Sequence, residues 1–292
     1  MVDPVLKWAG GKRGLLKEIK NIFPKQYKNY HEPFIGGGAM FFHLTPVNGS
    51  INDINPDLIN FYKILKNYPS ELIKHTSRLD HNVEVYYIVR AGFNELKTGV
   101  KKAAFFLYLN RTGFNGLYRV NKKGEFNVPF GKYKNPTIVD EKRILSASHA
   151  LNQTKIYNED FEYILDVAKK DDLVYFDPPY EPMSDTSNFT AYSKSGFTIE
   201  DQKRLSKTCK ILDDAGVNFI LSNSHVDRII QLYEEFHIYT VKARRAINSD
   251  ASKRGAVNEI LVTNIPQRER VEKLNQSTFD ELVHLRRVLK DE

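Results

Sequence analysis

One short apolar run that stops at an acid and two prolines constrains the fold of this chain most. The residues Leu173–Phe176 are all apolar or aromatic, and Asp177-Pro178-Pro179-Tyr180 follows directly. A run of this kind is typical of a strand that is buried on both faces, as in a parallel sheet. Proline cannot continue a sheet ladder, so the strand is predicted to end there. Asp177 then lies at the carboxyl edge, where open α/β sheets bind ligands.

The same tetrapeptide predicts a pocket for a flat ring that carries an amine. The Asp177 carboxylate and the carbonyl groups near Pro178 and Pro179 are acceptors that no ladder uses, and Tyr180 offers an aromatic face. An exocyclic amine such as adenine N6 fits two acceptors beside one ring. A plain strand followed by a proline-stiffened turn would explain the bare tetrapeptide equally well.

A glycine-rich turn near the amino terminus predicts a second ligand site. A strand, a tight turn and a helix are indicated by His31-Glu32-Pro33-Phe34-Ile35-Gly36-Gly37-Gly38 and the apolar Met40-Phe41-Phe42. Asp53 follows a predicted strand at Ser50-Ile51 and lies 17 residues after Gly36, near the usual offset of a ribose-binding carboxylate. Asp53 is therefore predicted to bind ribose hydroxyls, although it would also serve as the N-cap of a helix from Pro56 onward.

A third motif, Lys7-Trp8-Ala9-Gly10-Gly11-Lys12, precedes both and predicts an extended segment that turns into a helix. The GxxxxGK[ST] spacing of a phosphate loop is absent, which argues against nucleotide hydrolysis. Trp8 and Lys12 fit an aromatic wall and a partner for a cofactor carboxylate. They fit a core anchor and a surface charge equally well.

Composition sets broad limits on the class of protein. A chain of 292 residues with 41% hydrophobic residues can form a substantial core. It contains no run of 18 apolar residues and no signal-peptide pattern, which predicts a soluble cytoplasmic protein. Cys209 is the only cysteine, and the histidines lack zinc-site spacing, so we expect neither a disulfide nor a metal ion.

The net charge of +7 is concentrated in one segment. Residues 101–134 contain eight basic residues and one acidic residue, so the rest of the chain sums to zero. Aromatic residues are interleaved with these charges, which predicts contact with nucleic acid through phosphate neutralisation and base stacking. The aromatic residues are Phe105, Phe106, Tyr108, Phe114, Tyr118, Phe126, Phe130 and Tyr133.

Taken in order, these motifs resemble the Dam family of DNA adenine-N6 methyltransferases over nearly the whole chain up to about residue 265. The resemblance extends into residues 109–121 and 124–131, which are similar to the family's recognition hairpin. It implies a Rossmann-like class I methyltransferase sheet with helices on both faces, which binds S-adenosylmethionine. It also implies an inserted, mainly helical domain that contacts double-stranded DNA through a β-hairpin. The implied reaction is N6 methylation of a flipped adenine, commonly within GATC.

The resemblance also implies roles for individual residues. The implied catalytic residues are Asp177, Pro178, Pro179 and Tyr180. The implied cofactor-binding residues are Trp8, Lys12, Phe34, Gly36, Gly38, Asp53, Asp160, Phe161 and Asp177. The resemblance and the basic segment together give the expected DNA-binding residues Lys7, Arg111, Phe114, Asn115, Leu117, Arg119, Lys122 and Lys123. Phe114 stands where a close relative carries tyrosine, which preserves a wedge and loses a hydroxyl.

The expected organisation is a catalytic domain over residues 1–56 and 141–266, with a DNA-recognition insert over residues 57–140. A β-hairpin is predicted from residues 117–120 and 125–128, which flank a turn signal. Two loops, 182–196 and 246–258, are expected to be mobile. The first, with Phe189 and Tyr192, is expected to close over the target base, and the second, with Lys253 and Arg254, to approach phosphates. Plain surface connections would explain both loops equally well. Leucine spacing predicts a helical tail over residues 267–292.

Several alternatives stay open at this point. An RNA adenine or DNA cytosine-N4 methyltransferase would carry a similar pocket, and a non-catalytic Rossmann-like DNA-binding protein would keep the basic segment without needing Asp177. The missing GxGxxG argues against a nicotinamide-dependent dehydrogenase. We expect a monomer, and a cognate restriction endonuclease is a conceivable functional partner.

Overall fold

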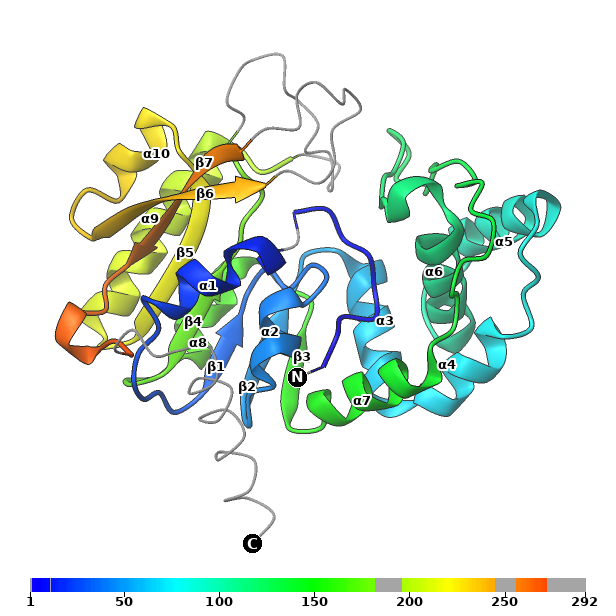
Figure 1. The fold of residues 1–292 in the computed structure, drawn as a ribbon, viewed down its shortest axis with the longest axis horizontal. Helices are drawn as coiled ribbons and strands as arrows, with labels where there is room; N and C mark the ends of the chain where they lie inside the picture. Colours follow the sequence, from blue (N-terminus) through cyan, green and yellow to red (C-terminus); the bar gives the residue numbers. More distant parts are fainter. Residues whose placement is uncertain (1, 11, 182–195, 245–255, 272–292) are drawn as a thin grey trace, which may run out of the picture.

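The computed structural model describes residues 2–10, 12–181, 196–244 and 256–271 (Figure 1). Most of the two predicted loops, including Phe189, Tyr192, Lys253 and Arg254, lies outside these ranges. So does the predicted tail helix beyond residue 271, where the described chain ends shortly after the short 3-10 helix Gln267–Glu269.

The centre of the molecule is a seven-stranded sheet with the order β3-β2-β1-β4-β5-β7-β6. Strands β1 to β5 run parallel, and β7 runs antiparallel to both of its neighbours. The bounds are β1 Tyr30–Glu32, β2 Gly49–Asn52, β3 Thr154–Tyr157, β4 Leu173–Phe176, β5 Asn218–Ser224, β6 His237–Arg244 and β7 Ala256–Thr263. All seven strands overlap segments that the sequence pattern predicts as strands, which after residue 140 are residues 155–157, 173–176, 218–222, 238–242 and 259–263.

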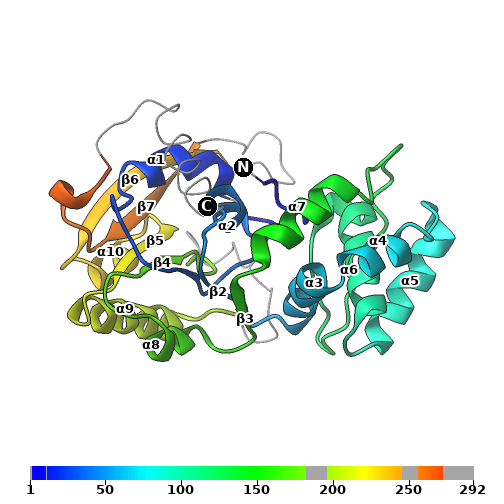
Figure 2. The same cartoon turned by 90° about the horizontal axis from the view of Figure 1, so that it is seen from below.

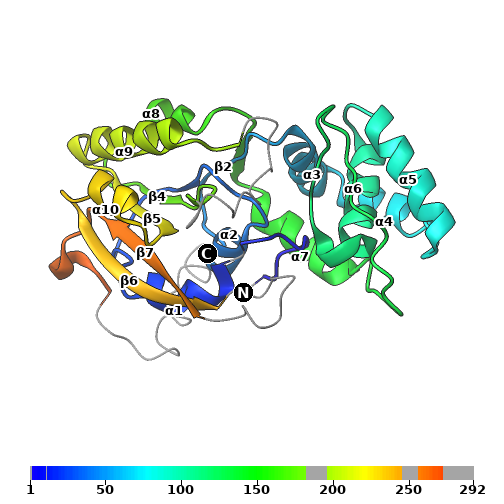
Figure 3. The same ribbon diagram turned by 90° about the horizontal axis from the view of Figure 1, so that it is seen from above.

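Helices cover both faces of the sheet, as expected for an α/β fold. Helices α1 (Leu16–Lys20) and α2 (Ala39–Leu44) lie on one face, and α8 (Ile164–Val167) and α9 (Ile199–Asp214) lie on the other (Figures 2 and 3). The alternation of side chains along β4 explains why its whole sequence is apolar. Leu173 and Tyr175 belong to one hydrophobic cluster, and Val174 and Phe176 belong to the other. Helix α10 (Asp227–Leu232) follows β5.

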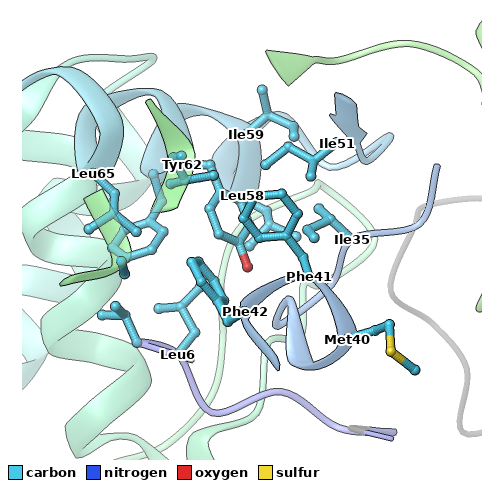
Figure 4. Packing of buried hydrophobic residues seen from close by; sticks show 14 of the residues in the cluster. Leu6, Ile35, Met40, Phe41, Phe42, Ile51, Leu58, Ile59, Tyr62 and Leu65 are labelled. Atoms are coloured by element: carbon cyan, nitrogen blue, oxygen red, sulfur yellow. The ribbon is translucent and has the colours of Figure 1, made fainter. Parts of the chain in front are cut away.

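A group of helices between β2 and β3 lies beside the sheet (Figure 1). Its members are α3 (Pro56–Asn67), α4 (Pro69–Thr76), α5 (Val83–Glu95), α6 (Val100–Thr112) and α7 (Glu141–Leu151). Helix α3 joins this group to the sheet, because Leu58 and Tyr62 pack in one cluster with Phe41 and Phe42 of α2 (Figure 4). The core is therefore continuous from sheet to helices, and the predicted division into domains stays a prediction.

The predicted β-hairpin is only partly formed. The chain does reverse at residues 121–124, with a hydrogen bond of 2.9 Å from the Gly124 amide to the Asn121 carbonyl. However, the two flanking segments form no regular strand and share one isolated bridge, between Val120 and Phe126. Two backbone hydrogen bonds flank this bridge, from the Asn121 amide to the Glu125 carbonyl and from the Asn127 amide to the Arg119 carbonyl. The two segments therefore pair, but the two regular strands of the prediction are not confirmed. The Phe126 backbone bonds to the Asn94 side chain in both directions.

Neither a membrane-spanning helix nor a metal-binding cluster occurs among the described residues. No described helix has the length and apolar character needed to cross a membrane. The described residues contain no group of three or more histidine, cysteine, aspartate or glutamate side chains arranged to hold a metal ion.

Candidate active site

Asp177 lies at the carboxyl end of β4 and is held by two side chains from other parts of the sequence. The Lys12 Nζ atom lies 2.9 Å from Asp177 Oδ1, and the Ser222 hydroxyl donates a hydrogen bond of 3.0 Å to the same oxygen. Ser222 belongs to the neighbouring strand β5 and lies 3.2 Å from the Tyr175 hydroxyl. Burial raises the pKa of Asp177, and the contacts with Lys12 and Ser222 oppose this shift. Among the described residues, Oδ2 of Asp177 accepts no hydrogen bond.

The aromatic ring and the carbonyls beside Asp177 are fixed as well. Lys12 Nζ lies 4.3 Å from the centroid of the Tyr180 ring, and the Tyr180 hydroxyl donates a hydrogen bond of 2.8 Å to Glu259 on β7. The carbonyl of Pro179 accepts a hydrogen bond of 3.1 Å from the Gln202 side chain. The sequence predicts that the carbonyls of Pro178 and Pro179 face a ligand. The Pro179 carbonyl instead accepts from a side chain of the protein.

Asp53 follows β2 and closes the glycine turn that follows β1. Its two carboxylate oxygens accept hydrogen bonds from the amides of Gly36, at 3.2 Å, and Asn55, at 3.0 Å. Gly36 and Gly38 have φ angles of 45° and 71°, which glycine adopts without strain. Burial raises the pKa of Asp53 to about 6, although both amide hydrogen bonds lower it. Asn55, not Asp53, is the N-cap of α3, since its side chain accepts from two amides of the first turn.

Trp8 packs against the same glycine turn. A Cβ atom on Gly36 would lie 2.9 Å from Trp8 Cδ1, and one on Gly37 would lie 2.7 Å from Trp8 Cβ. The turn therefore has no room for a larger side chain at either position. The tryptophan ring stacks on Tyr118, with ring centroids 5.8 Å apart. Trp8 is consequently a packing residue at the glycine turn, and its role as an aromatic wall for a cofactor stays a prediction.

The loop after β3 lies at the same carboxyl edge of the sheet and carries Asp160 and Phe161. Phe161 lies 5.5 Å from Phe34, measured between ring centroids, so the fold brings together two of the expected cofactor-binding residues from different loops. Asp160 is exposed, caps the following 3-10 helix and accepts a hydrogen bond of 2.8 Å from Arg204. Asn52 ties the loops to one another through hydrogen bonds to Pro33 and Glu159. The predicted cofactor-binding residues thus lie along adjoining carboxyl ends of β1, β2, β3 and β4, together with the Trp8–Lys12 segment.

The expected recognition residues of the turn after α6 are presented at the surface. Phe114 is 49% exposed, an uncommon position for a large aromatic side chain, and begins the 3-10 helix Phe114–Gly116. Asn115 is also exposed and has a φ of 54°. Arg119 is exposed, with its Nε atom donating a hydrogen bond of 2.7 Å to the Asn127 side chain. Leu117 is half-buried between them.

The expected basic contacts differ in their exposure. Lys122 and Lys123 are exposed in the chain reversal at residues 121–124. Lys7 is half-buried with its Nζ 4.3 Å from the centroid of the Tyr133 ring, and burial and Arg111 lower its pKa. Arg111 is only 9% exposed, and burial and the charge of Arg143 lower its pKa. The sequence grouped Arg111 with the basic residues that are expected to bind DNA, whereas the structure places its side chain largely inside the protein. Its role in DNA contact stays a prediction.

Sequence reasoning missed three residues that fix the candidate site, namely Ser222, Gln202 and Glu259. Ser222 had a usable signal, because Ser222-Asn223-Ser224 ends an apolar strand just as Asp177 ends β4. Glu259 had none in the sequence alone. It lies opposite Ser224 because β7 is antiparallel to β5, which brings the first half of β7 to the carboxyl edge.

The arrangement suits the binding of a nucleoside-bearing ligand next to a flat amine. Asp53 supplies a buried carboxylate acceptor, and the glycine turn supplies close backbone approach. Asp177 and Tyr180 supply an acceptor and a ring within reach of the same lysine.

Comparison with known proteins agrees with this chemistry. Residues 8–247 match the model of a family described as D12 class N6 adenine-specific DNA methyltransferase. The type II methyltransferase M1.LlaDCHI of Lactococcus lactis subsp. cremoris is 46% identical over 269 residues, covering 89% of this chain and 95% of that protein. The type II methyltransferase M.MjaIII of Methanocaldococcus jannaschii is 44% identical over 286 residues, covering 90% and 99%. The DNA adenine methylase of Escherichia coli K12 is 39% identical over 267 residues, covering 89% and 95%.

Proposed function

Because the chain belongs to the D12 class N6 adenine-specific DNA methyltransferase family, we propose that it methylates an adenine flipped out of duplex DNA, with S-adenosylmethionine as the donor. The observation that carries this proposal is the Asp177 carboxylate. Lys12 and Ser222 bind one oxygen of this carboxylate. The carboxylate lies next to the ring of Tyr180, whose hydroxyl is bound to Glu259. The family and the activity as an adenine-specific DNA methyltransferase are established by the comparisons, and the proposal concerns the donor, the state of the base and the target sequence.

Asp177 acts on the amine in this proposal. Adenine N6 is flat and barely basic because its lone pair is conjugated with the ring. Hydrogen bonds from N6 to Asp177 Oδ2 and to the Pro178 carbonyl would draw the lone pair out of conjugation. The carboxylate also offsets the positive charge that develops on N6 during transfer, and its fixed position avoids reorganisation at that moment. Tyr180 stacks on the ring and holds its plane.

The observed donor and acceptor set fits S-adenosylmethionine. Asp53 would accept from the ribose hydroxyls, Phe34 and Phe161 would flank the adenine of the cofactor, and Trp8 and Lys12 would adjoin its amino acid end. When bound, the cofactor supplies a methyl group that its sulfonium already activates, so the chain needs to align N6 with it and to exclude water. The two prolines and Tyr180 serve that alignment.

Base flipping follows from the same geometry. A paired adenine has its N6 amine engaged with thymine, so it must leave the stack to meet both Asp177 and Tyr180. The exposed Phe114 fits a wedge that occupies the vacated space, and Lys122 and Lys123 fit phosphate contacts. Arg119 suits the major-groove acceptors of guanine. Together with the resemblance of this segment to recognition hairpins, these features lead us to propose GATC as the target.

Incubation of the protein with unmethylated plasmid and S-adenosylmethionine, followed by single-molecule sequencing, tests the proposal. N6-methyladenine confined to GATC is the expected result. Modification at another motif would overturn the target sequence and keep the chemistry. N4-methylcytosine would overturn the base assignment, and methyl transfer to RNA alone would overturn duplex DNA as substrate.

The wider setting is also part of the proposal. We infer action as a cytoplasmic monomer, either in general methylation of the host genome or beside a cognate restriction endonuclease. Two of the relatives are named type II methyltransferases and others are named DNA adenine methylases, so the names of relatives do not separate these settings.

A further inference from the structure

Asn110 makes an unusual set of contacts for a residue that the reaction does not use. It lies on α6 and is only 4% exposed. Its side-chain oxygen accepts a hydrogen bond of 2.8 Å from the Lys7 amide, and its side-chain nitrogen donates one of 2.7 Å to the Lys7 carbonyl. The same nitrogen donates a third hydrogen bond, of 3.1 Å, to the Gly116 carbonyl. One buried amide therefore binds two backbone segments that are far apart in sequence.

The first of these segments leads directly to the candidate cofactor site. Lys7 precedes Trp8, whose ring packs on the glycine turn at Gly36 and Gly37. The segment continues to Lys12, which binds Asp177. A displacement of the Lys7 backbone would therefore move one wall of the cofactor site and the partner of the catalytic carboxylate.

The second segment is the turn that presents Phe114. Gly116 ends this turn with a φ of 63°, and a Cβ atom there would lie 2.6 Å from Lys7 Cβ. The turn and the Lys7 segment are thus in direct contact as well as bound to one amide. Tyr118, two residues later, stacks on Trp8 and strengthens the same connection.

We propose that Asn110 is a positioning residue that couples the DNA-contacting turn to the cofactor-binding segment. Ordering of the Lys7–Lys12 segment by the cofactor would fix the Phe114–Gly116 turn for DNA, and DNA would in turn favour the cofactor-binding arrangement. Coupling of this kind is reciprocal, because each ligand changes the affinity of the other by the same factor. This inference rests on the proposed function.

The test compares DNA affinity with and without S-adenosylhomocysteine. Fluorescence anisotropy would give the Kd of a duplex that carries the sequence methylated by the unmodified protein. We expect saturating S-adenosylhomocysteine to lower this Kd by about tenfold, within the usual range of coupling between sites. The variant Asn110→Asp keeps the shape and the acceptor but loses both donated hydrogen bonds. It should still bind S-adenosylhomocysteine. The coupling factor, which is the Kd of the duplex without S-adenosylhomocysteine divided by the Kd with it, should fall to nearly one.

Asn94 offers a matched control on α5. Its side chain accepts from the Phe126 amide at 2.8 Å and donates to the Phe126 carbonyl at 3.2 Å, so it binds a backbone in the same two-way manner. Neither of these contacts involves the Lys7 segment. Asn94→Asp should therefore weaken DNA binding with and without S-adenosylhomocysteine and leave the coupling factor at its wild-type value.

Two outcomes would overturn the inference. One is a folded Asn110→Asp protein with the wild-type coupling factor. The other is a wild-type protein that methylates DNA yet shows the same Kd in both conditions, which separates a failure of the coupling from a failure of the proposed function. If Asn110→Asp does not fold, Gly116→Ala is the second variant. Its methyl group would lie too close to the Lys7 side chain and would displace the Lys7 segment, so this variant should also lower the coupling factor.

Discussion

The proposed catalytic edge and the proposed DNA-contacting turn, Phe114–Gly116, differ in which atoms the protein holds in place. At the edge, the proposed catalytic side chains are themselves bound by the protein, as with Asp177 by Lys12 and Ser222 and Tyr180 by Glu259. In the turn, Phe114 is exposed, and the Asn110 side chain binds the backbone at the Gly116 carbonyl.

The difference follows from what each region must do. Methyl transfer needs reacting atoms in fixed places, so the polar atoms around them are oriented before the substrate arrives. A DNA-contacting side chain must instead leave its polar or aromatic end for the ligand, and rigidity can come only from the backbone. Arg119 combines the two arrangements, because the Asn127 side chain binds its guanidinium although the residue is exposed.

Asp177→Asn should give the largest effect, at the fixed edge. The amide places a donor where the substrate amine needs an acceptor, and it removes the negative charge opposite the developing cation. The expected fall in kcat is about 10²–10³-fold, measured with radiolabelled S-adenosylmethionine and duplex DNA. Asp171→Asn is the control at the opposite end of β4, where an exposed pair with Lys28 contributes little. A rate for Asp177→Asn within a fewfold of wild type would remove the carboxylate from the mechanism.

Arg119→Ala probes the exposed turn and should act on choice of sequence more than on rate. Loss of a guanidinium that bonds to one base should relax discrimination at one position of the target by about 1–3 kcal/mol. Methylation rates on duplexes with single base changes would measure this. Lys123→Ala is the contrasting variant, since loss of a phosphate contact should weaken binding evenly and lower the salt dependence. An even loss over all sequences for Arg119→Ala would assign it to phosphate instead.

The pH dependence of cofactor binding should show a smaller effect at Asp53. Burial raises the pKa of this carboxyl to about 6, and only the ionised form offers acceptors to both ribose hydroxyls. Affinity for S-adenosylhomocysteine should therefore fall as the pH drops through this value, by about tenfold at pH 5 relative to neutral pH. Calorimetric titration would measure it. Asp53→Asn should bind more weakly at neutral pH and show a flat profile, and an equally steep profile in this variant would assign the titration to another group.

The sheet could be predicted well from sequence because its strands have clear boundaries. The bounds of β4 match the predicted run because Asp177 and two prolines follow it. The strands β6 and β7 extend beyond their predicted cores, since they pair with each other over eight residues that include polar positions such as Lys242 and Asn258. Strand pairing of this kind depends on the partner, which local sequence does not reveal.

The candidate site was predictable only where a motif is local. Asp177, Asp53 and the glycine turn each follow a recognisable strand, so their place at one edge could be inferred. Asn110 and Glu259 act through partners 103 and 79 residues away, respectively, and only the fold brings each pair together. The two regular strands predicted for the hairpin are not confirmed, and the sequence does not show that the Asn94 side chain would bind the Phe126 backbone.

A crystal structure with duplex DNA and S-adenosylhomocysteine would test the central contrast most directly. We predict that the contacts of Asp177 with Lys12 and Ser222 persist, with a flipped adenine on Tyr180 and its N6 at Asp177 Oδ2. The Arg119 guanidinium should have left the Asn127 side chain and bound a base, and the Phe114 side chain should lie inside the DNA duplex. An adenine still within the stack, or an Asp177 that binds the base only after leaving Lys12 and Ser222, would contradict a preformed catalytic edge.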